Sequence, residues 1–205
     1  MNYIAIETST NICSVALFKS NEMIGLIENE EKKSHSKELG VSVKSIIDHN
    51  NILINDINYI ALSSGPGSFT GLRIGSSLAK GMAFALKIPI VMVPTLQSLE
   101  FAIKIKENHN ICVFSHSDQF YLQNFKNGLP KSDIKLVSAN DLKSNRKRLF
   151  GYGLEKSSIP FNYTEIKPSA KLIGKISKLK FDDWVVKDIN EAELNYINNF
   201  NIKKT

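Results

Sequence analysis

The sequence predicts an α/β protein that begins with a three-stranded meander and continues with alternating helices and strands. Three β-like runs open the chain at Tyr3–Glu7, Ile12–Phe18 and Met23–Glu28, and turn-rich tetrapeptides separate them. After them, helical periodicity alternates with short apolar runs, a pattern typical of crossover connections in a sheet. The element order over residues 1–108 is therefore β-β-β-α-β-α-β-α.

The elements after the meander follow from apolar spacing and from helix start and stop signals. The first helix is expected to begin at Ser34 or Ser36 and to end at Asn50. The next elements are a strand at Tyr59–Ser63, a loop at Gly65–Thr70, a helix at Leu72–Leu86, a strand at Ile90–Val93 and a helix from Thr95 to about Lys106. This order describes one half of a ribonuclease-H-like, actin/Hsp70-type (ASKHA) fold.

The rest of the chain is expected to form a reduced second half of the same fold. It restarts with two strands and then becomes irregular. Its expected elements are strands at Ile111–Phe114, Phe120–Phe125, Arg148–Gly151 and Tyr163–Ile166, a short helix near Asp141–Ser144 and a helix around Ser169–Leu179. A polar stretch at Glu107–Asn110 marks the boundary, which gives halves of residues 1–108 and 109–205.

Composition indicates an ordinary globular protein, because 42% of the residues are hydrophobic and 22% are charged. No apolar run is long enough to cross a membrane, and the N-terminus carries no signal-peptide pattern. The cytoplasm is therefore the expected location. Cys13 and Cys112 each lie within an apolar run, so they are expected to be small core residues rather than a disulfide or metal ligands.

The net charge of +6 is concentrated in the second half of the chain. Residues 108–205 carry sixteen Lys and Arg against ten Asp and Glu, whereas residues 1–107 carry ten of each. This excess, and the run Arg146–Arg148 within it, could face a polyanion such as RNA. Solvated lysine-rich faces and a solvated loop explain the same counts, so both interpretations stay open.

The most informative stretch is Ser63–Gly75, which follows a strand and opens a helix. It matches neither the Walker A motif nor the dinucleotide Gly-x-Gly-x-x-Gly motif, so it is a weak phosphate motif, and its Gly-Pro-Gly fixes a tight turn. In the helix, small residues recur every four positions at Gly71, Gly75, Ala79 and Ala83. Such a stripe allows close approach of another element, either within the molecule or from a partner.

Several motifs in the first half resemble the TsaB family, bacterial proteins formerly grouped with glycoproteases. The resemblance is carried by Ser64–Gly75 with Ala79–Gly81, by the opening Ile6–Thr10 with Cys13–Leu17, and by His35 and Ser36 at the first helix. It is dense over residues 1–100 and thins beyond residue 110. Where the family has Asp-Ala-Arg, this chain has Phe-Ser-His at 114–116.

The resemblance implies a non-catalytic subunit in tRNA modification, an inactive homologue of the enzyme TsaD. Such a subunit pairs with TsaD and, with the ATPase TsaE, supports threonylcarbamoyl transfer from threonylcarbamoyl-AMP to the tRNA adenosine beside the anticodon. It implies no tightly bound cofactor in this chain alone, with ATP or ADP at the TsaD interface left open. It also implies only indirect or weak tRNA contact and no membrane association.

Pairing with TsaD would use the two helices that map onto about Ser36–His49 and Leu72–Leu86. The small-residue stripe then becomes the expected contact, so Gly75→Leu or Ala79→Leu should abolish TsaD binding while the isolated chain stays folded. The partner-binding residues expected on this basis are His35, Glu38, Leu39, Gly67, Ser68, Phe69, Thr70, Leu72, Arg73, Gly75, Ser76, Ala79, Lys80 and Ala83.

No catalytic or metal-binding residue is expected in this chain. The two metal-binding histidines of the catalytic homologue correspond here to Thr95 and Leu99, which cannot replace imidazole ligands. Phosphate-binding hairpins of this fold class use glycine and an acid. The hairpin after Glu7 lacks the glycine, and so does the one that holds Asp118, so both are expected to be degraded.

Two alternatives come from other classes of protein. A small Ser-dependent peptidase could use Ser68 with His35 or His116 as the base and Asp118 behind it, although no nucleophile-elbow motif is present. The two helices of the first half could instead pack against a second copy of the chain, which would give a nucleotide-binding homodimer.

Overall fold

The computed structural model describes residues 1–30, 35–103 and 105–197 and contains two six-stranded sheets. The strand order in the first sheet is β12-β5-β4-β1-β2-β3. Neighbouring pairs are antiparallel except for β1 with β4 and β4 with β5, which are parallel. Its strands are β1 (Asn2–Glu7), β2 (Cys13–Lys19), β3 (Glu22–Asn29), β4 (Ile57–Gly65), β5 (Ile90–Pro94) and β12 (Val185–Val186). The ASKHA-like α/β fold expected from the sequence is therefore present.

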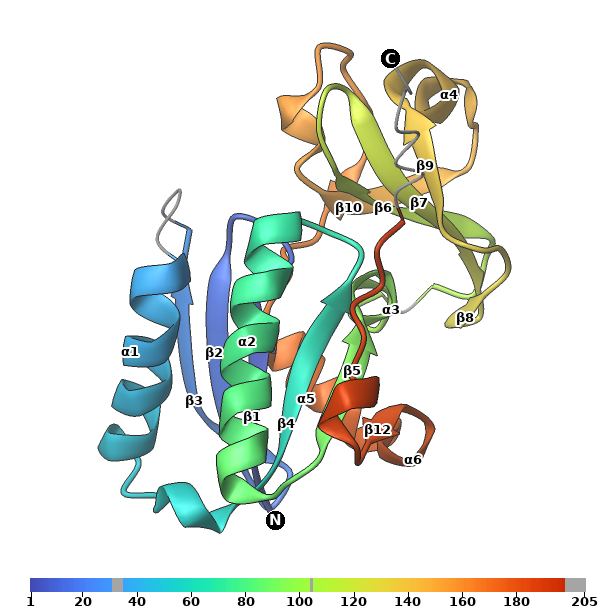
Figure 1. The fold of residues 1–205 in the computed structure, drawn as a ribbon. Helices are drawn as coiled ribbons and strands as arrows, with labels where there is room; N and C mark the ends of the chain where they lie inside the picture. Colours follow the sequence, from blue (N-terminus) through green and yellow to red (C-terminus); the bar gives the residue numbers. More distant parts are fainter. Residues whose placement is uncertain (31–34, 104, 198–205) are drawn as a thin grey trace.

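The second sheet has shorter strands on the whole. It lies at the end of the first sheet where β1 and β4 terminate (Figure 1). Its strand order is β11-β10-β6-β7-β8, and β9 also pairs with β7. The strands are β6 (His109–Phe114), β7 (Gln119–Lys126), β8 (Leu129–Pro130), β9 (Lys135–Ser138), β10 (Arg148–Tyr152) and β11 (Thr164–Glu165). The short helix α4 (Ala139–Ser144) follows β9.

Two helices cover one face of the first sheet because each has a continuous apolar stripe. They are α1 (His35–His49) and α2 (Phe69–Leu86), which lie side by side in Figure 1. Leu39, Val43 and Ile46 of α1 and Ala79 and Ala83 of α2 join one buried cluster with inward residues of β1, β2 and β4. Burial of this apolar face is the main favourable contribution to the packing.

The opposite face of the first sheet is covered by segments from the far end of the chain. These are α5 (Ala170–Leu179) and α6 (Phe181–Trp184). Beneath them the rings of Tyr3, Phe18 and Tyr59 stack, with centroid separations of 4.7 Å for Tyr3–Phe18 and 4.4 Å for Tyr3–Tyr59. Gly174 of α5 lies on the ring of Phe18, where a Cβ would overlap ring carbons. The aromatic stack and α5 therefore fix each other's positions.

The predicted division into residues 1–108 and 109–205 needs a correction at its far end. Strand β6 begins at His109, near the predicted boundary, but α5 and β12 return to the first sheet, where β12 pairs with β5. The sequence predicted the helix at Ser169–Leu179 but assigned it to the wrong half. Its periodicity shows that one face is apolar, but it cannot show which sheet that face covers.

The third helix is shorter than predicted. Helix α3 spans Thr95–Glu100 rather than continuing to about Lys106. The chain leaves it through i→i−3 hydrogen bonds, from the N–H of Ala102 to the carbonyl of Leu99 and from the N–H of Ile103 to that of Glu100. The Glu100 carboxylate and the imidazole of His109 form a buried pair, which joins the end of α3 to the start of β6.

The predicted start of the first helix can be compared only in part. Ser34 lies outside the described residues, and Ser36 is inside the first turn of α1 rather than before it. Helix α2 begins at Phe69, three residues earlier than predicted, because Ser68 caps it. No helix among residues 1–30, 35–103 and 105–197 has both the length and the apolar character needed to cross a bilayer.

The small-residue stripe of α2 faces inward, against the molecule's own sheet. An added Cβ would overlap the carbonyl oxygen of Thr8 at Gly71 and the hydroxyl of Thr8 at Gly75. Ala79 and Ala83 are fully buried in the core. The prediction that this stripe contacts a partner is therefore wrong, and we expect Gly75→Leu and Ala79→Leu to destabilise the fold instead of leaving it unchanged. The stripe lets α2 lie close to β1.

We expect Gly75→Leu to lower the free energy of unfolding by at least about 2 kcal/mol, because overpacking without space forces the backbone to move. The matched control is Gly81→Leu on the same helix, where an added Cβ has no heavy atom within 4 Å. That variant should gain up to about 1 kcal/mol from helix propensity. Denaturant unfolding measures both, and a wild-type midpoint for Gly75→Leu would contradict the assigned packing.

Candidate functional site

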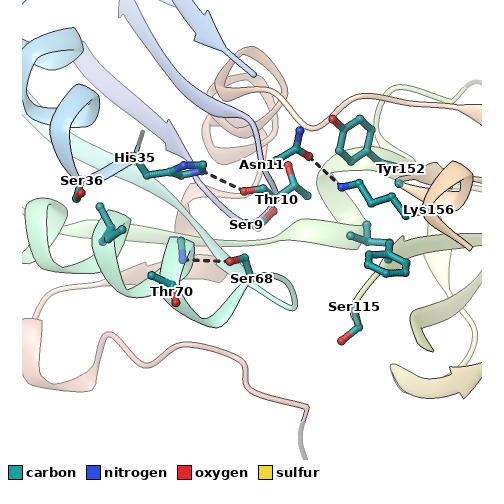
Figure 2. A pocket seen from close by; sticks show the side chains of 15 residues that line it. Ser9, Thr10, Asn11, His35, Ser36, Ser68, Thr70, Ser115, Tyr152 and Lys156 are labelled. Carbon is teal, nitrogen blue, oxygen red and sulfur yellow. Dashed lines mark hydrogen bonds between the residues drawn. The ribbon is translucent and has the colours of Figure 1, made fainter. Parts of the chain in front are cut away.

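A cleft of about 620 Å³ separates the end of the first sheet from the second sheet (Figure 2). One wall comes from the β1–β2 turn and from the starts of α1 and α2. The other comes from the end of β6, the end of β10 and the turn that follows β10. The cleft is lined by Ser9, Thr10, Asn11, His35, Ser36, Ser68, Thr70, Gly71, Ile74, Val113, Phe114, Ser115, Tyr152, Gly153 and Lys156.

The loop before α2 is held against the β1–β2 turn by its backbone. The N–H of Ser68 donates to the carbonyl of Ser9 at 2.6 Å, and the Ser68 hydroxyl accepts from the N–H of Gly71 at 3.2 Å. Glycine is required at position 67, since a Cβ there would overlap the Ser9 carbonyl. The first turn of α2 is thereby fixed at the edge of the cleft.

His35 is part of the same framework. Its Nε2 lies 3.0 Å from the carbonyl oxygen of Thr10, which can only accept, so the ring donates. The side chain is buried and joins the start of α1 to the β1–β2 turn. His35 was predicted as a partner contact, but its position makes it a structural connection between two elements, as Figure 2 shows.

Polar groups without full hydrogen bonding lie beneath the cleft. Glu7 is fully buried at the end of β1, where one carboxylate oxygen accepts from the N–H of Ser9. The other oxygen and the hydroxyls of Thr8 and Ser9 have no partner in the described structure. Burial raises the pKa of Glu7 to about 7. Desolvation thus outweighs the hydrogen bonds from Ser9 and Ser63, which act in the opposite direction.

The far wall supplies one cation. Lys156 Nζ lies 3.3 Å from Asn11 Oδ1 across the cleft and 5.7 Å from the ring centroids of Phe114 and Tyr152. The cleft thus combines an ammonium group, hydroxyls and an apolar wall, a combination suited to a small polar or anionic molecule. Among the described residues, no three His, Cys, Asp or Glu side chains come together as a metal site would require.

Of the residues proposed for a peptidase, Ser68 and His35 both line the cleft, but each is bonded to backbone rather than to the other. The Ser68 hydroxyl caps α2, and His35 bonds the backbone. His116 Nδ1 lies 2.9 Å from the hydroxyl of its neighbour Ser115. The Asp118 carboxylate accepts from the hydroxyls of Ser157 and Ser158 and from the N–H of Ser158, and these bonds hold its pKa below the usual range. These four side chains therefore do not form the hydrogen-bonded series of nucleophile, base and acid that a catalytic triad requires.

Thr95 and Leu99, at the positions of the catalytic homologue's histidines, lie on α3 and are fully buried. Ser98 between them donates its hydroxyl proton to the Thr95 carbonyl at 2.8 Å. These side chains pack in the interior, where Leu96 and Leu99 belong to the core of the second half. Leu96 and Leu99 thereby form part of the packing between α3 and the second sheet.

Half of the predicted partner-binding residues are interior. The buried ones are His35, Leu39, Leu72, Gly75, Ser76, Ala79 and Ala83. The others reach the surface at least in part: Glu38, Gly67, Ser68, Phe69, Thr70, Arg73 and Lys80. Two of these already have contacts within the chain, since the Arg73 guanidinium lies 3.8 Å from the Phe69 ring centroid and both side chains contact Tyr196.

The surface that α1 and α2 present to solvent contains residues that the sequence analysis did not select. A groove of about 580 Å³ runs between the two helices, past Gly40, Phe69, Arg73 and Ser77. An added Cβ at Gly40 or at Gly81 would meet no heavy atom within 4 Å. Large apolar side chains are also exposed on the same two helices, with Val41 of α1 67% and Phe84 of α2 77% exposed. In the sequence, the large apolar residues at outward positions of the two helices were the available signal for this surface. The buried small-residue stripe predicts nothing about the opposite face of α2.

The burial of Glu7 predicts a specific pH dependence. Its pKa is about 7 in the folded chain against an ordinary 4.5, so the folded state binds the proton more tightly. Stability from this group is complete below the unfolded pKa and is lost as the pH rises through the folded value. The free energy of unfolding of Glu7→Gln should therefore rise by about 2 kcal/mol relative to that of the wild type as the pH goes from about 5 to about 8, measured by urea unfolding. An equal difference at both pH values would contradict the raised pKa.

Comparison with known proteins identifies relatives of the first half. The model of the TsaD family, described as tRNA N6-adenosine threonylcarbamoyltransferase, matches residues 15–142, which is more than half of the chain. A protein of Buchnera aphidicola subsp. Schizaphis graminum, named tRNA threonylcarbamoyladenosine biosynthesis protein TsaB, is 41% identical over 96 residues. That match covers 47% of this chain and 45% of the relative.

Other matches have the same character. The Escherichia coli protein of the same name is 35% identical over 99 residues, which cover 48% of this chain and 42% of the relative. The chain thus spans about half the length of the curated relatives that it matches. A solved structure from Pseudomonas aeruginosa, an uncharacterized protein with similarity to peptidase YEAZ, superimposes with a TM-score of 0.80.

That superposition covers 96% of this chain and 99% of the other at 21% identity, so it shows a shared fold over nearly the whole molecule. The family match over residues 15–142 includes α1 and α2, which build the exposed helix groove and contribute to one wall of the cleft. On these grounds the chain belongs to the TsaD family, and within it the TsaB proteins are the relatives that it resembles.

Proposed function

We propose that the chain is a non-catalytic support subunit of the complex that transfers a threonylcarbamoyl group to the tRNA adenosine beside the anticodon. The names of the relatives supply the pathway, threonylcarbamoyladenosine biosynthesis on tRNA. Thr95 and Leu99, at the positions where the catalytic homologue binds metal, are packed in the core, which supports a role other than catalysis. We expect a subunit that works on tRNA to act in the cytoplasm.

The proposed partner is a TsaD protein, with TsaE as a further component of the complex. The exposed face of α1 and α2 supports this choice, and it is the single observation that carries the docking proposal. Gly40, Ser77 and Gly81 leave the helix backbones accessible, and Val41 and Phe84 supply apolar area beside them. Accessible backbone flanked by large apolar side chains is a surface against which another helix pair can pack.

We expect Gly40→Leu and Gly81→Leu each to weaken TsaD binding at least about tenfold, because a leucine would occupy the space of the approaching helix. Both positions are open, so the variants should fold normally. Isothermal calorimetry with the TsaD protein of the same cells measures the affinity. The control is Lys178→Leu on α5, which adds a leucine to an exposed position on the opposite face of the first sheet. Unchanged affinity in both glycine variants would overturn docking through this face.

The same face is available to a second copy of the chain, so a homodimer of the isolated chain can coexist with the heterodimer. In that case TsaD and the second copy compete for one surface. Sedimentation of the wild type and of Gly81→Leu distinguishes the states, since the substitution would disrupt both assemblies.

A nucleotide, ATP or ADP, is proposed at the joint surface with TsaD rather than in the cleft of this chain alone. In the cleft, the β1–β2 turn presents Ser9 and Thr10 and the β6–β7 hairpin presents Ser115, where phosphate-binding hairpins of this fold class carry glycine. Lys156 also spans the cleft to Asn11. We expect calorimetry to show ADP binding by the mixture with TsaD and none by this chain alone. Tight ADP binding by the isolated chain would contradict this assignment.

A further inference from the structure

A second concave surface lies in the other half of the molecule, away from the cleft and from α1 and α2. It is a groove of about 530 Å³ between the end of α4, the start of β10 and the segment that precedes β11. We call it the basic groove. It is lined by Leu142, Lys143, Asn145, Arg146, Lys147, Arg148, Leu149, Pro160, Phe161, Asn162, Tyr163 and Thr164.

The basic groove carries four cations and no carboxylate among its lining residues. Lys143, Arg146, Lys147 and Arg148 are all exposed. Over the described residues, the ion pairs of the chain involve other side chains, at Lys44, His109, Lys167 and Lys180. The positive charge of the groove is therefore not neutralised by ion pairs within the described chain.

Acids also lie beside the groove: Asp141 and Glu165 are next in sequence to lining residues, and Glu155 contacts the lining residue Tyr163. The Asp141 carboxylate accepts from the hydroxyl and N–H of Ser138 and so caps α4. The Glu155 carboxylate accepts from the hydroxyl of Tyr163 at 3.3 Å. Both carboxylates therefore already accept hydrogen bonds from within the chain. A groove with this imbalance attracts a polyanion, and the second half contains the whole excess of positive charge in the sequence.

The cations project from a fixed backbone. The N–H of Lys147 donates to Asn145 Oδ1 at 3.2 Å, which shapes the turn after α4. Arg148 opens β10, which lies parallel to β6, and its guanidinium is 5.1 Å from the ring centroid of Phe150. Because the turn is held by hydrogen bonds and the strand by its ladder, ordering the groove for a ligand costs little backbone entropy.

We propose that the basic groove binds the phosphate backbone of RNA. Two arginines, two lysines and the amides of Asn145 and Asn162 are the side-chain types that contact phosphate and sugar. The partly buried rings of Phe161 and Tyr163 line the groove and add apolar surface. A concave surface favours a ridge of phosphates over a flat anionic membrane. The identification of this RNA as tRNA rests on the proposed function. The proposal that the groove binds RNA does not depend on it.

The test measures binding of fluorescently labelled bulk tRNA to the full chain by anisotropy, between about 50 and about 200 mM salt. We expect the double variant Arg146→Glu/Lys147→Glu to weaken binding at least about tenfold and to lower the slope of log affinity against log salt by about 1 to 2. The matched control is Lys171→Glu/Lys175→Glu, which makes the same change of net charge on exposed residues of α5. Its affinity for tRNA should equal that of the wild type, apart from a small loss at every salt concentration.

Three results would overturn the proposal: equal loss in the groove variant and the control, no measurable tRNA binding by the wild type at low salt, or preferential binding to phosphatidylserine vesicles. TsaD affinity is measured on the same variants. Loss of tRNA binding with TsaD binding retained supports the basic groove as a separate site. Failure of the wild type to bind TsaD would overturn the proposed function, while the RNA result would still decide the groove.

Discussion

The structure depends on the close approach of α2 to the β1–β2 turn. Gly71 and Gly75 lie on Thr8 where no side chain fits, and the backbone of Ser68 bonds the carbonyl of Ser9. This contact fixes the rotation of α2 about its own axis. Because one face of the helix is in contact with the sheet, the opposite face, with Gly81 and Phe84, must point to solvent. The surface proposed for docking is thus a consequence of internal packing.

Before its C-terminal segment, the chain crosses between its two halves twice. The first passage runs from α3 into β6, where the buried Glu100–His109 pair joins the two elements. The second runs from β11 back to α5, which packs beneath the first sheet beside Tyr3 and Phe18. Two passages limit relative motion of the halves more than one would. This agrees with a cleft whose two walls are also bridged by the contact between Lys156 and Asn11.

The two surfaces to which we assign partners lie on different halves and have different chemistry. The face of α1 and α2 is apolar with accessible backbone and suits another folded protein. The basic groove carries Lys143 and Arg146–Arg148 with no opposing acid in its lining and suits a phosphate backbone. A subunit that contacts an enzyme with one half and RNA with the other could align the two. Its contribution to a reaction would then be positional.

Residue patterns alone predicted the order of the elements over residues 1–108, because alternation and 3.6-residue spacing are local properties. They also supplied the family resemblance through Ser64–Gly75. The packing of the folded chain showed that Gly75 and Ala79 face the sheet, that α5 returns to the first half and that α3 stops at Glu100. Periodicity shows which residues share a face. What that face packs against depends on contacts between residues far apart in the chain, such as Gly75 with Thr8 and Gly174 with Phe18.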